Sequence, residues 1–311
     1  MLNLLKIYTD KRKLSRILLG ITSAIAIQIG ATGYYYVFIL GAPQLDVPKV
    51  ETPTKLKFEL ESFNSQAMGI RQYGVILPPE YQKNPHKRYP VIFLLHGGHD
   101  DARAYVDKYR IFNVLDELYK SGKLPPSIII TPDGNDLRGS SPLYDPDYYD
   151  GPNGKVGTLI GLELVKVVKS RYRTLEKPQF WALGGLSSGG WGAFNIGLRY
   201  LKNFNILFSH SGYFTDDSGS QNSPQEIVQK LSFNDKKRLR VYLDAGKSDR
   251  DLLASTKTFD ETLSKLGISH VFYAFPGGHG LSGADVGWNY FHKHLKDSLS
   301  YVGQQFKELK S

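Results

Sequence analysis

A serine occurs in a setting that suits nucleophilic catalysis. The motif Gly185-Leu186-Ser187-Ser188-Gly189 follows an apolar segment at 180–185 and precedes a helical pattern at 189–201. A Gly-x-Ser-x-Gly motif between a strand and a helix forms a tight turn that exposes the serine hydroxyl. We therefore expect Ser187 to be a nucleophile that attacks an acyl carbon. The spacing does not favour Ser188 in this role.

A histidine suited to act as the base follows the last predicted strand, in Pro276-Gly277-Gly278-His279-Gly280. Flanking glycines let the imidazole of His279 reach across a cleft to a serine hydroxyl. There it would accept the hydroxyl proton and return it to the leaving group. Among the other histidines, His210 precedes the expected acid and is predicted to be structural. His292 and His294 fall in a helical pattern and are predicted to lie on the surface.

An acid is expected after the strand RVYLDAG, residues 240–246. The order serine, acid, histidine along the chain is the one that accompanies a Gly-x-Ser-x-Gly turn in an α/β sheet. Asp244 would lie within or at the end of the strand, and Asp251 would already begin a helix. We favour Asp249, which lies in the loop between them, and Asp244 and Asp251 stay open as alternatives.

The end of another predicted strand offers hydrogen-bond donors for an oxyanion. In Leu94-Leu95-His96-Gly97-Gly98-His99 the small residues allow a backbone N–H to turn toward a substrate carbonyl. The N–H groups of Gly98 and Ser188 are therefore expected to form an oxyanion hole.

The elements that must position these residues alternate along the chain. Short segments that are apolar on both faces predict buried strands of a mainly parallel sheet, at 91–95, 127–131, 180–185, 206–211, 240–246 and 270–277. Helical patterns lie between them, at 103–120, 157–171, 189–201, 255–266 and 284–298. Alternation at 56–61 and a segment at 71–78 predict an antiparallel entry pair. Together they predict one doubly wound α/β domain.

Two loops should border the site. The loop 133–154 is rich in Gly, Asp, Pro and Tyr and is predicted to lie on the ligand-binding rim, with its tyrosine-rich part, 143–149, as an aromatic border. The polar stretch 212–238 is too short for a large cap. An open cleft for bulky or polymeric esters is expected.

The N-terminal region predicts a membrane anchor. Residues 17–40 contain no charged side chain and are long enough to span a bilayer. The preceding basic tail, 1–16, places the N-terminus in the cytoplasm and the domain outside it. Residues 41–55 form a proline-containing linker, and 56–311 the catalytic domain. A signal peptide cleaved near Ala24-Ile25-Ala26, giving a secreted protein, is the alternative.

The bulk composition narrows the function classes. The absence of cysteine excludes disulfides, thiolate metal sites and cysteine nucleophiles. No metal-ligand motif such as His-Glu-x-x-His occurs, so neither a metal nor a cofactor is expected. The net charge of +9 is uneven, because the first sixteen residues carry +4 of it, and the mild excess on the rest of the chain does not predict nucleic acid as a partner.

These motifs together resemble the putative-esterase group of α/β-hydrolases over roughly residues 56–300. That group contains feruloyl and acetyl-xylan esterases, siderophore esterases, S-formylglutathione hydrolase and mycolyltransferases. The resemblance rests on VIFLLHGG, SRYRT, GGLSSGGWGA, DAGKSD and PGGHG. It implies the α/β-hydrolase fold, with a mostly parallel central sheet of about eight strands and helices on both faces. Members usually carry methionine where this chain has Ser188.

The resemblance implies that Ser187, Asp249 and His279 form the triad, with Gly98 and Ser188 as oxyanion donors. Hydrolysis of a carboxylic ester through an acyl-enzyme is the expected reaction. Acyl transfer to an alcohol, as in mycolyltransferases, is the alternative. A membrane-tethered scaffold without catalytic activity is the alternative from another class.

Overall fold

The computed structural model describes residues 2–35, 54–140, 144–280 and 283–308, with the backbone alone for 2–10. It divides into two units, Met1–Pro43 and Gln44–Ser311. The first contains α1 (Leu2–Tyr34), so the basic segment predicted as a tail is helical. Within α1, Lys11–Tyr34 is long and apolar enough to cross a membrane, a test that an N-terminal signal sequence would also pass. Residues 36–40 of the predicted span and 41–53 of the predicted linker lie outside the described residues.

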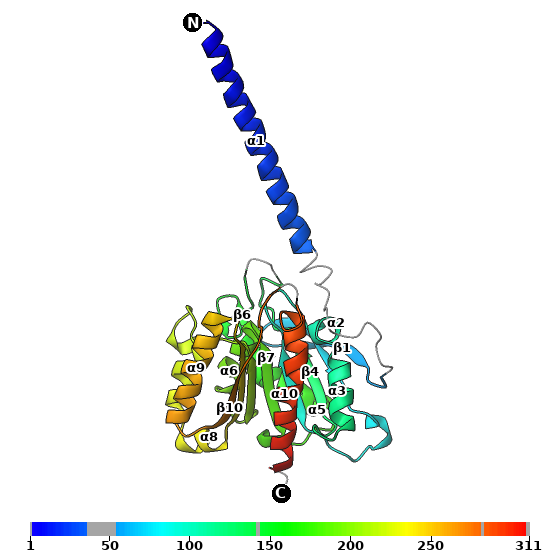
Figure 1. Ribbon diagram of the computed structural model, residues 1–311. Coiled ribbons are helices and arrows are strands. Elements are labelled where there is room, and N and C mark those ends of the chain that lie inside the picture. Colours follow the sequence, from blue (N-terminus) through cyan, green and yellow to red (C-terminus); the bar gives the residue numbers. More distant parts are fainter. Residues whose placement is uncertain (1, 36–53, 141–143, 281–282, 309–311) are drawn as a thin grey trace. The chain divides into compact units, whose positions relative to one another are not determined.

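The second unit is built on an eight-stranded sheet in the order β1-β2-β4-β3-β7-β8-β9-β10 (Figure 1). β1 pairs antiparallel with β2, and β2 with β4, which confirms the antiparallel entry pair. The other pairings are parallel. The strands are β1 (Phe58–Ser65), β2 (Gly69–Ile76), β3 (Val91–Leu95), β4 (Ile128–Pro132), β7 (Trp181–Leu186), β8 (Ile206–His210), β9 (Arg240–Gly246) and β10 (Ser269–Phe275).

The connections reverse direction beside β3. The chain leaves β3 for β4 on one side and returns to β7 on the other. In open α/β sheets, ligands bind outside the carboxyl ends of the strands at such a switch point. The segment that contains Gly98 and the turn that contains Ser187 therefore meet at this edge, because they directly follow β3 and β7.

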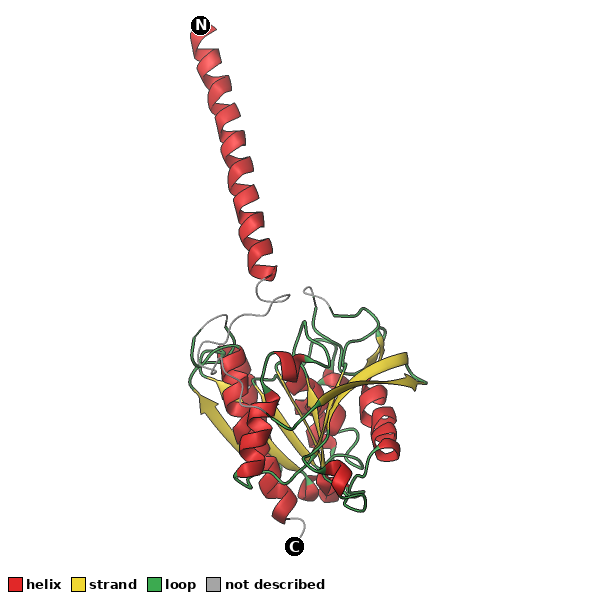
Figure 2. Cartoon of the chain, turned by 90° about the vertical axis from the view of Figure 1, so that its right-hand side faces the viewer, coloured by secondary structure: helices red, strands yellow, loops and turns green. Residues whose placement is uncertain are grey.

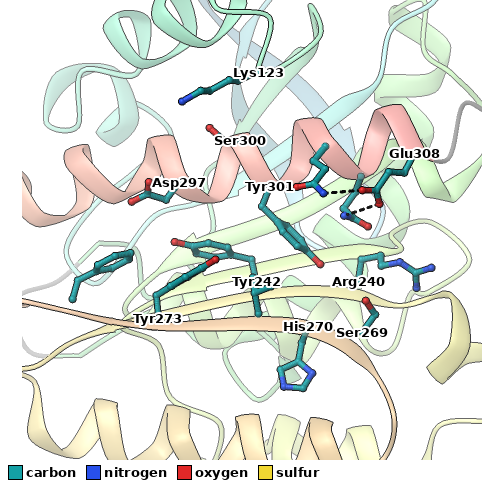
Figure 3. A pocket seen from close by; sticks show the side chains of 14 residues that line it. Lys123, Arg240, Tyr242, Ser269, His270, Tyr273, Asp297, Ser300, Tyr301 and Glu308 are labelled. Atoms are coloured by element: carbon teal, nitrogen blue, oxygen red, sulfur yellow. Dashed lines mark hydrogen bonds between the residues drawn. The ribbon is translucent and has the colours of Figure 1, made fainter.

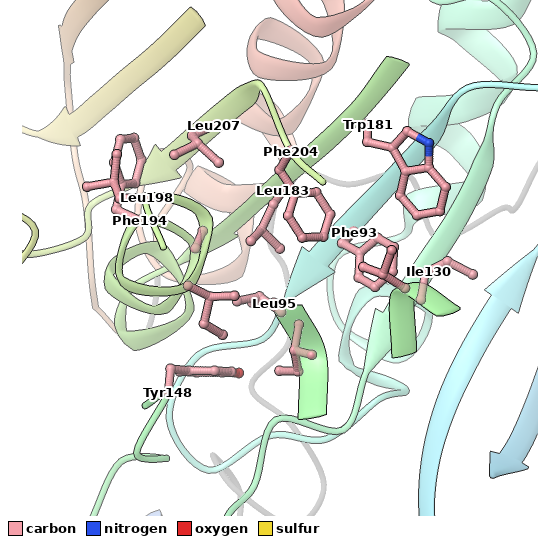
Figure 4. Close-up of a cluster of buried hydrophobic side chains, with 14 of the residues drawn as sticks. Phe93, Leu95, Ile130, Tyr148, Trp181, Leu183, Phe194, Leu198, Phe204 and Leu207 are labelled. Carbon is pink, nitrogen blue, oxygen red and sulfur yellow. The ribbon is translucent and has the colours of Figure 1, made fainter. Parts of the chain in front are cut away.

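Helices cover both faces of the sheet, as predicted (Figure 2). One face packs against α4 (Val156–Thr158), η3 (Leu159–Leu164), α5 (Val165–Arg171), α6 (Ser188–Gly197) and α9 (Arg250–Lys265). The other packs against α2 (Ala104–Asp107), α3 (Ile111–Lys120) and α10 (Trp288–Glu308). Successive strand residues alternate between the faces: Phe93 and Leu95 join the first cluster, shown in Figure 4, and Ile92 and Leu94 the second.

The remaining elements are short. A small hairpin, β5 (Asp150–Gly151) and β6 (Gly154–Lys155), lies within the loop 133–154. The stretch 212–238 folds into η5 (Ser220–Asn222), α7 (Pro224–Ile227), η6 (Val228–Lys230) and α8 (Phe233–Arg238). Two further turns of 3-10 helix are η2 (Tyr81–Lys83) and η4 (Pro178–Phe180).

The predicted helix bounds are only partly right: α9 begins at Arg250 rather than 255, α6 ends at Gly197 rather than 201, and two other helices differ more. The pattern 103–120 is divided into α2 and α3, because Arg110 adopts a left-handed conformation (φ 47°) and Asp100 binds Lys108 and Tyr109 from the connecting turn. The last helix starts later than predicted, at Trp288, and continues to Glu308.

The prediction that His292 and His294 lie on the surface is wrong. His294 is buried: its ring stacks on Phe275 at 3.8 Å, and its Nδ1 hydrogen-bonds Asp297 at 2.8 Å. His292 is partly buried, and its Nδ1 donates to the carbonyl of Tyr109 at 2.8 Å. α10 packs between the sheet and α3, so both faces of the helix find partners.

Candidate active site

Ser187 occupies a strained turn between β7 and α6. Its backbone has φ 53° and ψ −126°, a sparsely populated conformation for a residue with a side chain. Its N–H donates to the carbonyl of His210 at 2.9 Å, which fixes the turn to the neighbouring strand. The turn also requires Gly189: a Cβ there would come within 2.3 Å of the His96 carbonyl oxygen. The motif therefore places the serine tightly against the segment that follows β3.

The two predicted oxyanion donors have N–H groups that donate to no other described residue. Ser188 is the first residue of α6, where backbone N–H groups have no acceptor within the helix. Gly98 belongs to the segment after β3. Its neighbour Gly97 lies close to Ser187: a Cβ on Gly97 would be 3.5 Å from the Cβ of Ser187. Both N–H groups therefore lack an acceptor within the described residues, in segments next to Ser187 and next to Gly97.

Buried tyrosines hold the Gly98 segment in place. The phenol of Tyr105 donates to the carbonyl of Leu95 and that of Tyr148 to the carbonyl of His96, both at 2.9 Å. His96 accepts the N–H of Gly134 on Nε2 at 3.0 Å, and its Nδ1 donates to its neighbour's carbonyl. The segment is thus rigid, as a donor aimed at a developing charge must be.

Tyr148 corrects the predicted aromatic border. It is fully buried, belongs to the core cluster and lies against α6 (Figure 4), so this residue of 143–149 is not on a rim. Tyr149 is half-buried, and its ring meets that of Trp191 edge-on at 6.1 Å. Tyr148 is buried by contacts with segments distant in sequence, namely the His96 carbonyl and Gly192 of α6, which the local sequence pattern does not contain.

A carboxylate borders the Gly98 segment. A Cβ on Gly98 would come within 2.0 Å of Oδ1 of Asp145, so this glycine allows the exposed carboxylate to lie against the backbone. Burial, and then the charge of Asp145 and Asp216, raise the pKa of Tyr213, which therefore stays protonated. The ring of Tyr213 stacks on Trp191 at 5.4 Å. Sequence analysis identified neither Asp145 nor Tyr213.

His279 and Asp249 are in direct contact. Nδ1 of the imidazole and Oδ2 of the carboxylate are 2.8 Å apart, and the His279 N–H donates to Oδ1 at 2.8 Å. Gly278 has φ 138°, and a Cβ there would lie 2.5 Å from the Asp249 carboxyl carbon, so only glycine fits. The carboxylate is nearly buried, whereas the imidazole is 39% exposed and accessible to a substrate.

Ser187 and His279 follow different strands, at the same carboxyl end of the sheet. β7, β8, β9 and β10 are consecutive neighbours, and Ser187, Asp249 and His279 follow three of them. Within the described part of the chain, no hydrogen bond joins the Ser187 hydroxyl to the imidazole. Catalytic hydrogen bonds often shorten only when substrate binds.

Ser211, which was not predicted as a site residue, lies between the Ser187 turn and the end of β9. It follows His210, whose carbonyl binds Ser187, and its hydroxyl accepts the N–H of Gly246 at 3.1 Å. Its hydroxyl also helps to lower the pKa of the Asp249 carboxyl, after the larger effects of burial and of His279. The only signal in the sequence was its position at the end of a buried strand.

The other two candidate acids are placed elsewhere. Asp244 lies within β9, where Oδ2 binds Nδ1 of His210 at 2.6 Å and Oδ1 accepts the Tyr290 phenol at 2.8 Å. His210 also contacts the Ser298 hydroxyl at 2.9 Å through Nε2, and the group is buried. Asp251 is exposed in the first turn of α9. Of the three, Asp249 is the acid that touches His279.

The acid dependence of stability should reveal the Asp249 contact. Burial raises the pKa of this carboxyl, but the hydrogen bonds and charge of His279 outweigh it, and the net pKa is below its usual range. A depressed pKa stabilises the folded state above the ordinary carboxyl pKa of about 4, and this stabilisation is lost as the pH falls through the folded value. The difference in unfolding free energy between wild type and Asp249→Asn should therefore shrink from about pH 5 to about pH 3.

Urea unfolding at several pH values measures this difference. Asp251→Asn, which removes a nearby exposed carboxylate, controls for general charge effects. A difference that stays constant or widens toward low pH would contradict the depressed pKa.

Comparison with known proteins agrees with this architecture. The family model described as "Putative esterase" matches residues 65–301. Esterase Rv1288 of Mycobacterium tuberculosis is 27% identical over 264 residues, covering 70% of this chain and 54% of the relative. Endo-1,4-beta-xylanase Y of Acetivibrio thermocellus is 24% identical, covering 75% of this chain and 22% of the relative. The chain thus spans about half, or less, of the length of these relatives.

Solved structures show the same fold. A ferulic acid esterase superposes with a TM-score of 0.72 and 26% identity, over 80% of this chain and 99% of that structure. An S-formylglutathione hydrolase from Agrobacterium tumefaciens superposes with a TM-score of 0.64 and 16% identity, over 82% and 97%. The family model matches most of the domain, and the strand order of the sheet agrees with it. The chain therefore belongs to the "Putative esterase" family of α/β-hydrolases.

Proposed function

We propose that the chain hydrolyses a carboxylic ester, with Ser187 as nucleophile, His279 as base and Asp249 as the orienting acid. The observation that carries this proposal is the Asp249–His279 pair at the sheet edge where the strained Ser187 turn lies. An imidazole whose Nδ1–H is held by a carboxylate keeps Nε2 free to accept a proton.

The proposed reaction has two steps, acylation of Ser187 and hydrolysis of the acyl-enzyme. His279 takes the proton of the Ser187 hydroxyl as its oxygen bonds to the acyl carbon, and the imidazolium then protonates the departing alcohol. Water attacks the resulting acyl-enzyme, His279 takes a proton from it, and the acid leaves as Ser187 regains its hydrogen. The N–H groups of Gly98 and Ser188 stabilise the negative oxygen in both steps.

The surroundings of the site favour an uncharged, bulky ester. The carboxylate of Asp145 beside Gly98 repels acyl groups that carry negative charge. The stretch 212–238 supplies only short helices, so no large cap domain is built from it. Relatives named as ferulic acid esterase and acetyl esterase make aromatic and acetyl esters of polymers the first candidates.

We further propose that the domain works outside the cytoplasm. The helix Lys11–Tyr34 would hold it at the membrane as a signal anchor, with the basic side chains before the apolar stretch on the cytoplasmic side. Secretion after cleavage of the same segment would expose the domain on the same side.

A panel of p-nitrophenyl esters tests the activity. Acetyl and feruloyl esters should be hydrolysed faster than a succinyl ester, whose free carboxylate faces Asp145. Labelling by a fluorophosphonate probe should modify Ser187, identified by peptide mass. A folded protein that neither hydrolyses any ester nor accepts the probe would favour a scaffold. Formation of an alkyl ester when an alcohol is added would identify acyl transfer.

A further inference from the structure

A recess of about 790 Å³ lies between the edge strand β10 and the C-terminal half of α10 (Figure 3). It follows β10 from Ser269 to Phe275, and Tyr242 of β9 also lines it. None of Ser187, Asp249 and His279 lines it. The recess is thus a second concave surface on the domain, separate from the candidate active site.

Aromatic rings form one part of the recess. Figure 3 shows the rings of Tyr242, Tyr273 and Tyr301 between the strand and the helix. The ring of Tyr242 lies 5.8 Å from those of both other tyrosines, and Tyr273 is nearly parallel to Phe275 at 5.6 Å. Tyr273 is 47% exposed, so one part of its ring remains accessible beside these two contacts. These rings offer flat apolar faces to a ligand.

Polar groups form the other part. The Tyr242 side chain is 1% exposed, yet its hydroxyl has no hydrogen-bond partner among the described residues. Burial, and then the carboxylates of Asp244 and Asp297, raise the pKa of this phenol, so it remains a donor. A buried donor without a partner is costly, and a ligand hydroxyl would satisfy it. Gln304 and Gln305 of α10 also line the recess, and their amide nitrogens donate to Glu308 at 2.7 and 3.2 Å, as Figure 3 shows.

The charges in the lining cancel. Lys123 and Arg240 are balanced by Asp297 and Glu308, so neither a polyanion nor a polycation is favoured. Only Val271 and Phe275 among the lining side chains are wholly apolar, so the recess does not suit an acyl chain. Aromatic faces together with neutral hydrogen-bonding groups suit a ligand that has both apolar C–H faces and many hydroxyls.

We propose that this recess binds a neutral carbohydrate chain. Sugar rings would stack on Tyr273 and Tyr301, and a hydroxyl would accept the Tyr242 hydrogen bond. The carboxyl end of β10 is at Phe275, and His279 follows it by four residues. A glycan bound along this strand would therefore extend toward the candidate active site. The site binds sugar whether or not the bound chain carries an ester.

Calorimetric titration of the purified full chain tests the proposal. The protein is kept in a polyoxyethylene detergent, which carries no sugar head group, and is titrated with xylohexaose, cellohexaose and chitohexaose. An acidic chain, hexagalacturonate, is the comparison. At least one neutral hexasaccharide should bind saturably and more tightly than the acidic one. Protein blocked at Ser187 by a fluorophosphonate should bind it equally well, because the recess lies apart from that serine.

Two variants locate the binding. Tyr273→Ala should raise the dissociation constant about tenfold, because it removes the exposed stacking face. Tyr242→Phe, which keeps the ring, should raise it about fivefold through loss of the donor. Phe233→Ala removes an aromatic side chain that is 78% exposed on α8, away from the recess lining, and should bind as wild type does.

Three results would overturn the proposal: no neutral hexasaccharide binds at millimolar concentration, Tyr273→Ala binds like wild type, or the fluorophosphonate abolishes binding. Thermal midpoints of the variants identify any loss of fold, and Tyr242→Phe keeps the test decisive if Tyr273→Ala is unstable. Calorimetry measures binding whether or not the protein hydrolyses esters. A protein that binds sugar but hydrolyses no ester would therefore contradict the proposed function and leave the proposed sugar site standing.

Discussion

Replacing Ser187 with alanine should lower kcat for p-nitrophenyl acetate by about a thousandfold or more. The variant keeps the backbone N–H groups of Gly98 and Ser188, but no oxygen remains to attack the acyl carbon. KM should change little, because the hydroxyl makes few contacts with the ground state. Alanine has a Cβ as serine does, so the substitution leaves the backbone strain at φ 53° unchanged, and the fold should be retained. Initial rates over a range of substrate concentrations measure both constants.

Ser264→Ala is the matched control, since Ser264 is an exposed serine on α9. It should retain full activity and fluorophosphonate labelling. If Ser187→Ala keeps more than about a tenth of the wild-type rate, the nucleophile has been assigned wrongly.

Replacing Asp249 with asparagine should lower kcat by about ten-thousandfold at neutral pH. The carboxylate is 2.8 Å from Nδ1 of His279, and in the proposed mechanism it stabilises the imidazolium that forms during attack. An asparagine amide can donate to Nδ1 instead, which fixes the wrong tautomer and places a proton on Nε2, so the base can no longer accept one. Ester hydrolysis measured as a function of pH tests this expectation.

Two other variants separate the candidate acids. Asp251→Asn should be active, since that carboxylate is exposed on α9. Asp244→Asn should instead lose stability, by about 3 kcal/mol or more, because it breaks the buried contacts with His210 and Tyr290. An Asp251→Asn variant as inactive as Asp249→Asn would show that the acid is not the one in contact with His279.

The sequence predicted the sheet well because each buried strand is a short apolar segment with clear ends. The segment 91–95 is β3 without change, and 240–246 is β9 without change. Parallel strands also fix where their following loops lie, so the edge shared by Ser187, Asp249 and His279 could be predicted from chain order alone.

Side-chain burial was harder to predict, because it depends on elements distant in sequence. Tyr148 is buried because its phenol reaches the carbonyl of His96, 52 residues away. His294 is buried by stacking on Phe275 of another element. The Ser211 hydroxyl contacts Gly246, the last residue of the next strand, 35 residues away. Local patterns contain none of these contacts.

The order of the strands has a consequence for biosynthesis. The proposed nucleophile and oxyanion donors follow β7 and β3, near the centre of the sheet, whereas the proposed acid and base follow β9 and β10 at one side of it. Contacts between positions distant in sequence require long loops to close and slow the folding of a domain. A chain emerging from the ribosome would thus carry an unassisted serine until residue 279 and α10 have been added. If the proposed triad is right, the domain would become competent for ester cleavage only once its last strand and the residues after it are in place.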